Sequence, residues 1–301
     1  MTGWQVFGQQ LANGLTLGAI YALIALGYTM VYGVIQLINF AHGEVFMVGA
    51  YLALTALLAL GMSASASGWA LVALLAACAF FAMIGCGLLG FGIERAAYRP
   101  LRPRPADSAS QGGQTSRLAA LITAIGVSLV LQNAVMLVYG ATDRRVPPVV
   151  PSIRWEFAGV SITLLHLMIW LGAAGLMIAL HWLVMSTQLG RAMRAVAQDP
   201  KACWLLGIPV DRVVAMTFVI GSGLAGIGGM LFGLFYSTIN FHDGYVIGLK
   251  AFTAAVLGVL EGLGAGYVSS QWKNAFAFIV LVLLLMFKPT GLLGERVADR
   301  A

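Results

Sequence analysis

Residues 45–93 read VFMVGAYLALTALLALGMSASASGWALVALLAACAFFAMIGCGLLGFGI and contain no Asp, Glu, Lys or Arg. A helix needs about 20 consecutive apolar residues to cross the hydrocarbon core of a bilayer. The stretch is therefore long enough for two spans, separated by the Ser-, Ala- and Gly-rich turn at residues 61–68. Because a helix in lipid satisfies its own backbone hydrogen bonds, the stretch predicts a helical membrane protein.

Four further runs lack charged residues: residues 1–43, 118–142, 157–190 and 213–242. The 301-residue chain is 60% hydrophobic and 9% charged, whereas a soluble domain has about 25% charged residues. We predict an all-α, polytopic transmembrane protein with one domain over residues 1–301 and about eight membrane segments. These are expected at residues 9–34, 44–60, 69–93, 118–140, 162–188, 213–236, 250–268 and 274–287.

Basic residues gather in two short segments, at about residues 94–117 and 189–212. Basic loops between spans mark the cytoplasmic side of a membrane protein, so we place both loops there. The same clustering argues against nucleic acid as the partner of a chain whose net charge is +6, because the charges do not form one continuous basic face.

The second basic segment contains GRAMRAVAQDPKACWLLGIPVDR. Pro200 and Pro209 are expected to bracket a short helix, with Gly207 as its C-cap. Apolar positions occur around Arg191, Arg194 and Lys201: Ala192, Ala195 and Val196, and after Pro200 also Ala202, Leu205 and Leu206. The short helix could therefore lie on the lipid surface, dock into a partner or belong to a solvated basic loop. The chain has no G-x-x-x-x-G-K-[ST] phosphate-binding loop, so we expect no ATP hydrolysis by this chain.

One group of polar residues interrupts the first apolar stretch, within INFAHGEVFM: Asn39, His42, Gly43 and Glu44. A zinc helix would need a spacing such as H-E-x-x-H, and paired carboxylates would need Glu44 to meet another buried acid such as Glu261. We expect no metal here. The pattern favours a helix break, in which Asn39 caps the next span and Glu44 lies near its positive end. A place on a transport pathway is the alternative, since an ionisable group at membrane depth usually faces a cavity.

The same stretch has a partial echo in the second half of the chain. INFAHG at residues 38–43 recurs as INFHDG at residues 239–244, and Gly27 and Gly228 match at the same offset. Repeated halves with broken helices are common in transporters, so the echo indicates an internal repeat.

Several segments resemble the branched-chain amino acid permease family of ABC importers. In chain order they are NGLTLGAIYALIALGYTMVYGVIQLINFAHGE, GIERAAYRPLR, LAALITAIGVSLVLQN, AVAQDPKACWLLGIPVDRV, LKAFTAAVLG and KPTGLLG. They extend over almost the whole chain, and the chain is most similar to the first of the two permease types in the high-affinity leucine, isoleucine and valine system.

The resemblance implies a multi-pass permease of the bacterial inner membrane, surrounded by lipid and paired with a second, related permease. Two ABC ATPases would dock on the cytoplasmic side, a periplasmic binding protein would deliver the amino acid, and the chain itself would need no cofactor. The residues that match the family's ATPase-coupling loop are Gly190, Arg191, Arg194, Asp199, Pro200, Gly207 and Pro209.

The chain departs from the family after Gly258. Family members continue there through a Gly- and Pro-containing loop and another apolar helix, whereas this chain proceeds at once to VLEGLGAGYVSSQWKN. We expect one helix to be missing or fused in the C-terminal half, with impaired transport as a consequence. Other readings are urea, a short-chain amide or another amino acid as the substrate, an intramembrane enzyme, or a structural subunit that transports nothing.

Overall fold

The computed structural model describes residues 3–35, 39–60, 68–101, 113–157 and 159–251. Glu261, the deletion predicted after Gly258 and the last predicted membrane segments therefore lie outside the described residues, apart from the first two residues of segment 250–268.

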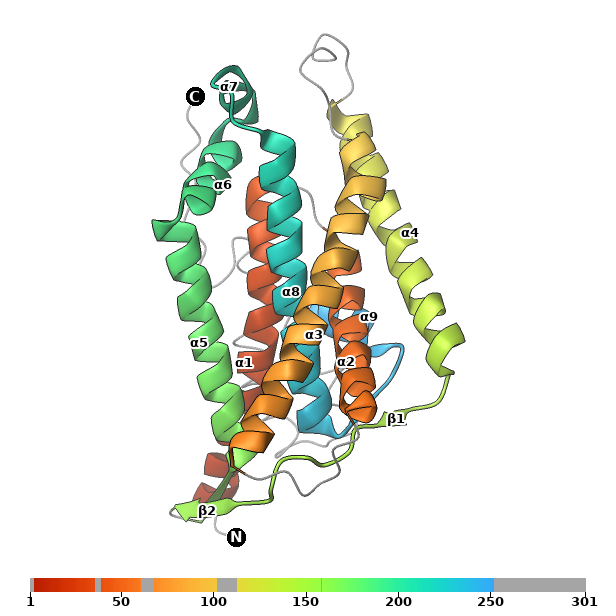
Figure 1. Ribbon diagram of the computed structural model, residues 1–301. Coiled ribbons are helices and arrows are strands. Elements are labelled where there is room, and N and C mark those ends of the chain that lie inside the picture. Colours follow the sequence, from red (N-terminus) through yellow and green to blue (C-terminus); the bar gives the residue numbers. More distant parts are fainter. Residues whose placement is uncertain (1–2, 36–38, 61–67, 102–112, 158, 252–301) are drawn as a thin grey trace.

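Helices make up most of the described chain (Figure 1). The long helices are α1 (Gly3–Ile35), α2 (Ala41–Ala59), α3 (Trp69–Ile93), α4 (Gly113–Tyr139), α5 (Leu164–Ser186) and α8 (Val210–Tyr236). The short helices are α6 (Gln188–Gln198), α7 (Pro200–Leu205) and α9 (Asp243–Ala251). α3 continues through the π-helical turn η1 (Glu94–Tyr98) and the 3-10 turn η2 (Arg99–Leu101). The all-α prediction is confirmed.

Six helices of the described part are long and apolar enough to cross a membrane. Their ranges are Gly3–Ile35, Ala41–Ala59, Trp69–Leu101, Leu118–Tyr139, Leu164–Ser186 and Val210–Tyr236. They correspond to the first six membrane segments predicted from the sequence, and the polytopic architecture is confirmed. The predicted total of eight depends on residues beyond 251.

α8 lies within the bundle and packs against α1, α2 and α3. Its glycine-rich stretch makes this close packing possible. A side-chain carbon on Gly226 would lie 2.7 Å from the Ala82 carbonyl oxygen of α3, and one on Gly229 would lie 2.8 Å from the Ala50 amide nitrogen of α2. Small residues allow helix backbones to approach closely in membrane proteins, so packing alone explains these glycines.

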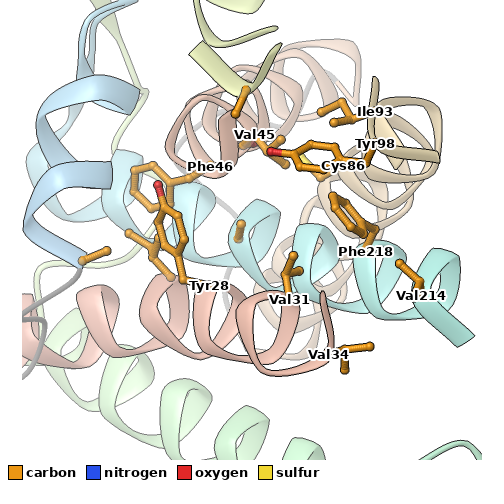
Figure 2. Close-up of a cluster of buried hydrophobic side chains, with 14 of the residues drawn as sticks. Tyr28, Val31, Val34, Val45, Phe46, Cys86, Ile93, Tyr98, Val214 and Phe218 are labelled. Carbon is orange, nitrogen blue, oxygen red and sulfur yellow. The ribbon is translucent and has the colours of Figure 1, made fainter. Parts of the chain in front are cut away.

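Figure 2 shows side chains that fill the space around α8. Tyr98 of η1 packs against Phe218 of α8, with the ring centres 5.2 Å apart. The Cys86 thiol of α3 donates a hydrogen bond to the Val45 carbonyl oxygen of α2, at 3.3 Å. Helices α2, α3 and α8 thus share one core.

α4 and α5 lie on opposite sides of this core (Figure 1). Few of their side chains are buried within the chain, in contrast to α2 and α8. Their exposed residues are mostly apolar, which suits a surface in contact with lipid.

The two ends of the bundle differ in structure (Figure 1). α6 and α7 lie at one end, and the beginning of α1 and the labelled strands lie towards the other. There, β1 (Arg144–Arg145) pairs antiparallel with β4 (Thr238–Ile239), and β2 (Arg154–Phe157) pairs with β3 (Val160–Thr163). Arg99 Nη2 lies 3.2 Å from Asp211 Oδ2, so the two basic segments of the sequence meet at the same end.

We expect the Gly229→Ala substitution to destabilise the bundle. The added carbon would meet the backbone of α2, which cannot move aside as a side chain can, and overpacking of this kind costs about 1–3 kcal/mol. Gly33→Ala is the matched control, because a carbon there meets nothing within 4 Å. Thermal unfolding of the two variants in detergent measures the difference. Equal midpoints would contradict the close contact of α2 and α8.

Candidate functional site

The polar residues of INFAHGEVFM lie where the chain passes from α1, which ends at Ile35, to α2, which begins at Ala41. The side-chain oxygen of buried Asn39 accepts hydrogen bonds from the Ala41 backbone N–H at 3.1 Å and from the Tyr98 hydroxyl at 3.0 Å. The His42 N–H donates to the Asn39 carbonyl oxygen at 3.0 Å. Asn39 thereby satisfies backbone groups that the start of a helix leaves without helical partners.

His42 and Gly43 face different neighbours. The fully buried His42 ring lies 4.7 Å from the ring of Tyr28 in α1, and neither of its nitrogens has a hydrogen-bond partner among the described residues. Gly43 faces α9, where a side-chain carbon on Gly43 would lie 2.8 Å from Gly248 Cα. Close helix packing therefore accounts for Gly43. Within the described part of the chain, no three His, Cys, Asp or Glu side chains are grouped to hold a metal ion.

Glu44 lies in the first turn of α2 and is only 1% exposed. The Ser128 hydroxyl of α4 donates to Glu44 Oε1 at 3.2 Å. Oε2 has no hydrogen-bond partner among the described residues and lies against Gly244 of α9. A negative charge near a helix N-terminus is stabilised by about 0.3–1 kcal/mol, whereas burying an unpaired charge costs several kcal/mol. The position at the start of α2 is therefore not sufficient to explain a buried carboxyl group.

The INFHDG echo forms the same turn as INFAHG. The His242 N–H donates to the Asn240 side-chain oxygen at 2.9 Å, and the Asp243 N–H donates to the Asn240 carbonyl oxygen at 3.1 Å. Asn39 accepts hydrogen bonds from backbone N–H groups at the same two relative positions. Helix α9 follows the turn at Asn240, just as α2 follows the turn at Asn39. The glycines of the two segments, Gly43 and Gly244, touch through their backbones. The repeat in the sequence is thus also a repeat of local structure.

A cavity of about 240 Å³ lies beside these two segments. Its lining residues come mainly from α4 and α9: Tyr28, Phe40, Ile125, Ser128, Leu129, Gln132, Gly244, Tyr245 and Gly248. Ser128 lies between the cavity and Glu44, because it lines the cavity and its hydroxyl donates a hydrogen bond to Glu44 Oε1. Gln132 Nε2 lies 2.8 Å from His242 Nδ1, at hydrogen-bonding distance. The cavity is smaller than the roughly 300–1,000 Å³ of pockets for drug-sized ligands, so it suits a small solute.

The sequence analysis did not single out Ser128 and Gln132. A signal for them exists, because they are polar residues four positions apart in a largely apolar span. That spacing places both on one face of a helix. What the sequence could not provide was the neighbour of that face, since α4 meets α2 and α9 only through the tertiary fold.

The second basic segment contains two helices, whereas the sequence predicted one. The additional helix, α6, packs against α5 and α8 and begins with Gly190 donating its N–H to the Thr187 hydroxyl at 3.0 Å. A side chain on Gly190 would collide with carbonyl oxygens of α5. The Arg194 guanidinium donates to the Val184 carbonyl oxygen, also in α5. Gly190 and Arg194 thus hold α6 against α5, while Arg191 is exposed.

The predicted short helix is α7, and its boundaries are well defined. The Asp199 side chain accepts two backbone N–H bonds from the first turn, at 2.8 and 3.0 Å, and Pro200 occupies the first helical position. Gly207 follows the helix in the left-handed conformation, with a φ of 79°, and donates its N–H to the Trp204 carbonyl oxygen at 3.1 Å. Pro209 directly precedes α8. The prediction of a helix between the two prolines, ended by Gly207, is confirmed.

Three large apolar residues are exposed at α7 and directly after it: Trp204, Leu205 and Leu206. Leu205 is 89% exposed, and Figure 1 shows α7 at the tip of the molecule. The sequence analysis counted the two leucines among the apolar positions of the loop but assigned none of the three to a site. An exposed apolar cluster next to basic residues is typical of a surface that contacts a partner protein or a membrane.

The family model described as "Branched-chain amino acid transport system / permease component" matches residues 10–288. The chain belongs to this family. Its transport permeases are membrane components and not enzymes, in keeping with the bundle of apolar helices. The sequence resemblance to the family is therefore confirmed.

Curated relatives of this permease include proteins of similar length. The high-affinity branched-chain amino acid transport system permease protein LivH of Escherichia coli (strain K12) is 43% identical over an alignment of 310 positions, gaps included, which covers 96% of each chain. The corresponding protein BraD of Pseudomonas aeruginosa is 43% identical over an alignment of 309 positions, which covers 95% of each chain. The autoinducer 2 import system permease protein LsrC of Klebsiella pneumoniae is 28% identical, over 57% of this chain and 49% of its own.

The alignment with the Escherichia coli relative is longer than the 301 residues of this permease. That relative therefore has residues without counterparts here. No solved structure matches the chain significantly.

We expect the Asn39→Ala substitution to destabilise the start of α2. It would leave the buried Ala41 N–H and Tyr98 hydroxyl without their common acceptor, and each unsatisfied buried group costs about 1–3 kcal/mol. Asn133→Ala is the control, since the exposed Asn133 side chain donates only within its own helix, to the Leu129 carbonyl oxygen. Hydrogen exchange of the first turn of α2 reports the effect, and unchanged protection in Asn39→Ala would refute it.

Proposed function

We propose that this chain is the permease subunit of an ABC importer for branched-chain amino acids, located in the bacterial inner membrane. The supporting observation is the 43% identity, over 96% of both chains, to a permease protein whose name specifies high-affinity branched-chain amino acid transport. The six apolar helices of the described part agree with a multi-pass location. The chain forms one half of the translocation pathway, and a second permease of the same family forms the other half.

ATP hydrolysis is the task of two separate ABC ATPases, and a periplasmic substrate-binding protein delivers the amino acid. The end of the bundle that carries α6 and α7 faces the cytoplasm, because basic segments between membrane spans prefer that side. The loop residues Gly190, Arg191, Arg194, Asp199, Pro200, Gly207 and Pro209 form the ATPase-coupling loop. Trp204, Leu205 and Leu206 are its contact surface, since they are exposed and apolar at the tip of this end.

The helix break at Asn39, His42, Gly43 and Glu44 belongs to the translocation pathway. The buried Glu44 carboxyl group and the adjoining cavity support this role, because ionisable residues within a membrane usually face cavities or pathways.

A second candidate is a permease with another substrate. The partial match to an autoinducer 2 import permease shows that related chains serve solutes other than amino acids. A transport-impaired permease is the remaining alternative and follows from the predicted loss of a helix after Gly258.

Uptake of radiolabelled leucine into proteoliposomes tests the function. The complex is reconstituted with both permeases, both ATPases and the binding protein. We expect ATP-dependent accumulation of leucine, isoleucine and valine, with no accumulation when ATP is replaced by a non-hydrolysable analogue. Uptake of urea or an amide in place of leucine would favour the second candidate. ATPase activity without uptake of any solute would favour the impaired permease.

The coupling surface is tested by the Leu205→Ala substitution. We expect it to weaken ATPase binding roughly tenfold or more, because an apolar side chain buried in a partner's groove contributes about 1.5–3 kcal/mol. Leu137→Ala is the matched control, because Leu137 of α4 is 82% exposed and lies outside the coupling loop. Co-purification of the ATPase at decreasing protein concentration measures both variants. Equal ATPase retention in the two variants would refute the assignment.

A further inference from the structure

Two polar residues of α4, one helical turn apart on the same face, line the cavity beside this helix. Gln132 pairs with His242 at hydrogen-bonding distance, and Ser128, one turn away, donates to Glu44. Both α4 residues line the cavity. Glu44 itself lies behind this lining, with Oε1 against Ser128 and Oε2 against Gly244. The carboxyl group is thus separated from the cavity by one hydroxyl group and one glycine.

The Glu44 carboxyl group has unused bonding capacity. Ser128 is its one hydrogen-bond partner in the described part of the chain, and Oε2 has none there. The ion pair between Arg99 and Asp211 lies elsewhere in the molecule. A carboxylate can accept several hydrogen bonds, and burying its charge costs several kcal/mol unless a cation compensates it. A positively charged group that enters from the cavity would provide that compensation.

The other lining residues indicate which kind of cation would bind in the cavity. Phe40, Ile125 and Leu129 give the cavity an apolar wall. A hydrated metal ion gains nothing from such a wall, whereas an organic ammonium with an aliphatic chain can place its charge at Glu44 and its chain against these residues. The volume of about 240 Å³ suits a solute of this size.

We infer that Glu44 and Ser128 form a binding site for the ammonium group of an aliphatic α-amino acid at the cavity between α4 and α9. This inference rests on the proposed function and adds to it the group of the substrate that is recognised and the residues that recognise it. Ser128 lines the cavity, and its hydroxyl can accept a hydrogen bond from the ammonium while it donates to Glu44 Oε1. The negative charge of Glu44, directly behind Ser128, attracts the ammonium to this place.

A structural role for Glu44 makes a different prediction. If the carboxyl group only stabilises the start of α2, its removal lowers stability but does not change how leucine protects the cavity wall from chemical labelling. If it binds an ammonium, the cavity attracts cations and repels anions, and this selectivity disappears when the charge is removed. Charge selectivity shows that the carboxylate acts on the cavity. Protection by leucine that requires both Glu44 and the ammonium group separates the two roles in a way that protein yield or transport rate does not.

The test uses a cysteine reporter on the cavity wall, Leu129→Cys, in the full transporter complex. The native cysteines Cys78, Cys86 and Cys203 are buried, and labelling is read on this chain at the reporter by mass spectrometry. We compare the reaction rates of a cationic aminoethyl and an anionic sulfonatoethyl methanethiosulfonate. Leu137→Cys is the matched control, because it is the same substitution on the same helix at a position that does not line the cavity.

With Glu44 present, we expect the reporter to prefer the cationic reagent by about tenfold or more over the preference at Leu137→Cys, since a unit charge within several ångströms in a low-dielectric site contributes more than 1.4 kcal/mol. Glu44→Gln should abolish this excess, and Glu44→Asp should retain it. Leucine should slow labelling of the reporter when Glu44 is present and should not do so in Glu44→Gln. The deaminated analogue 4-methylpentanoate should not slow labelling in either form.

Equal selectivity in the Glu44 and Glu44→Gln forms would overturn the inference, as would protection by 4-methylpentanoate equal to that by leucine. If Glu44→Gln does not assemble, comparison of leucine with 4-methylpentanoate in the Glu44 form decides the question. Failure of the proposed function would be seen separately, as absence of leucine uptake by the unsubstituted complex while the cavity still prefers the cationic reagent.

Discussion

The hydrogen bonds of Asn39 allow the chain to interrupt its helix inside the protein. A helix that begins at Ala41 leaves backbone N–H groups of its first turn without helical partners, and these cannot remain unpaired in an apolar environment. Asn39 accepts from both α2 and Tyr98, so one side chain fixes the start of α2 and attaches it to the end of α3. The placement of His42, Gly43 and Glu44 depends on this arrangement.

The contact between the two repeated segments depends on the same kind of turn. Asn240 repeats the backbone-donor bonds of Asn39, and α2 and α9 then approach through Gly43 and Gly244. Two short polar stretches, about two hundred residues apart, are thereby brought to one place. The cavity and the buried carboxyl group adjoin this contact, which suggests why polar residues recur at these two points of an apolar chain.

Local features of the sequence predicted much of the fold. Uncharged runs located the first six spans, because the bilayer imposes both their length and their lack of charge. Pro200, Gly207 and Pro209 located α7, because their backbone preferences act within a few residues. α6 was not predicted, since Gly190 favours a chain break when considered alone but is required by contact with α5 in the fold. The cavity was not predicted either, because the partner of Ser128 is 84 residues away in the chain.

α7 joins its neighbours without a flexible linker. Asp199 ends α6 and caps α7, while only Leu206, Gly207, Ile208 and Pro209 separate α7 from α8. Hydrogen bonds from Gly207 and Ile208 back to α7 stiffen that connection. The orientation of α7 is therefore tied to that of α8, whose far half touches α2 at Ala50. A change in the orientation of α7 would therefore be mechanically coupled to the contact between α8 and α2, the helix that carries Glu44.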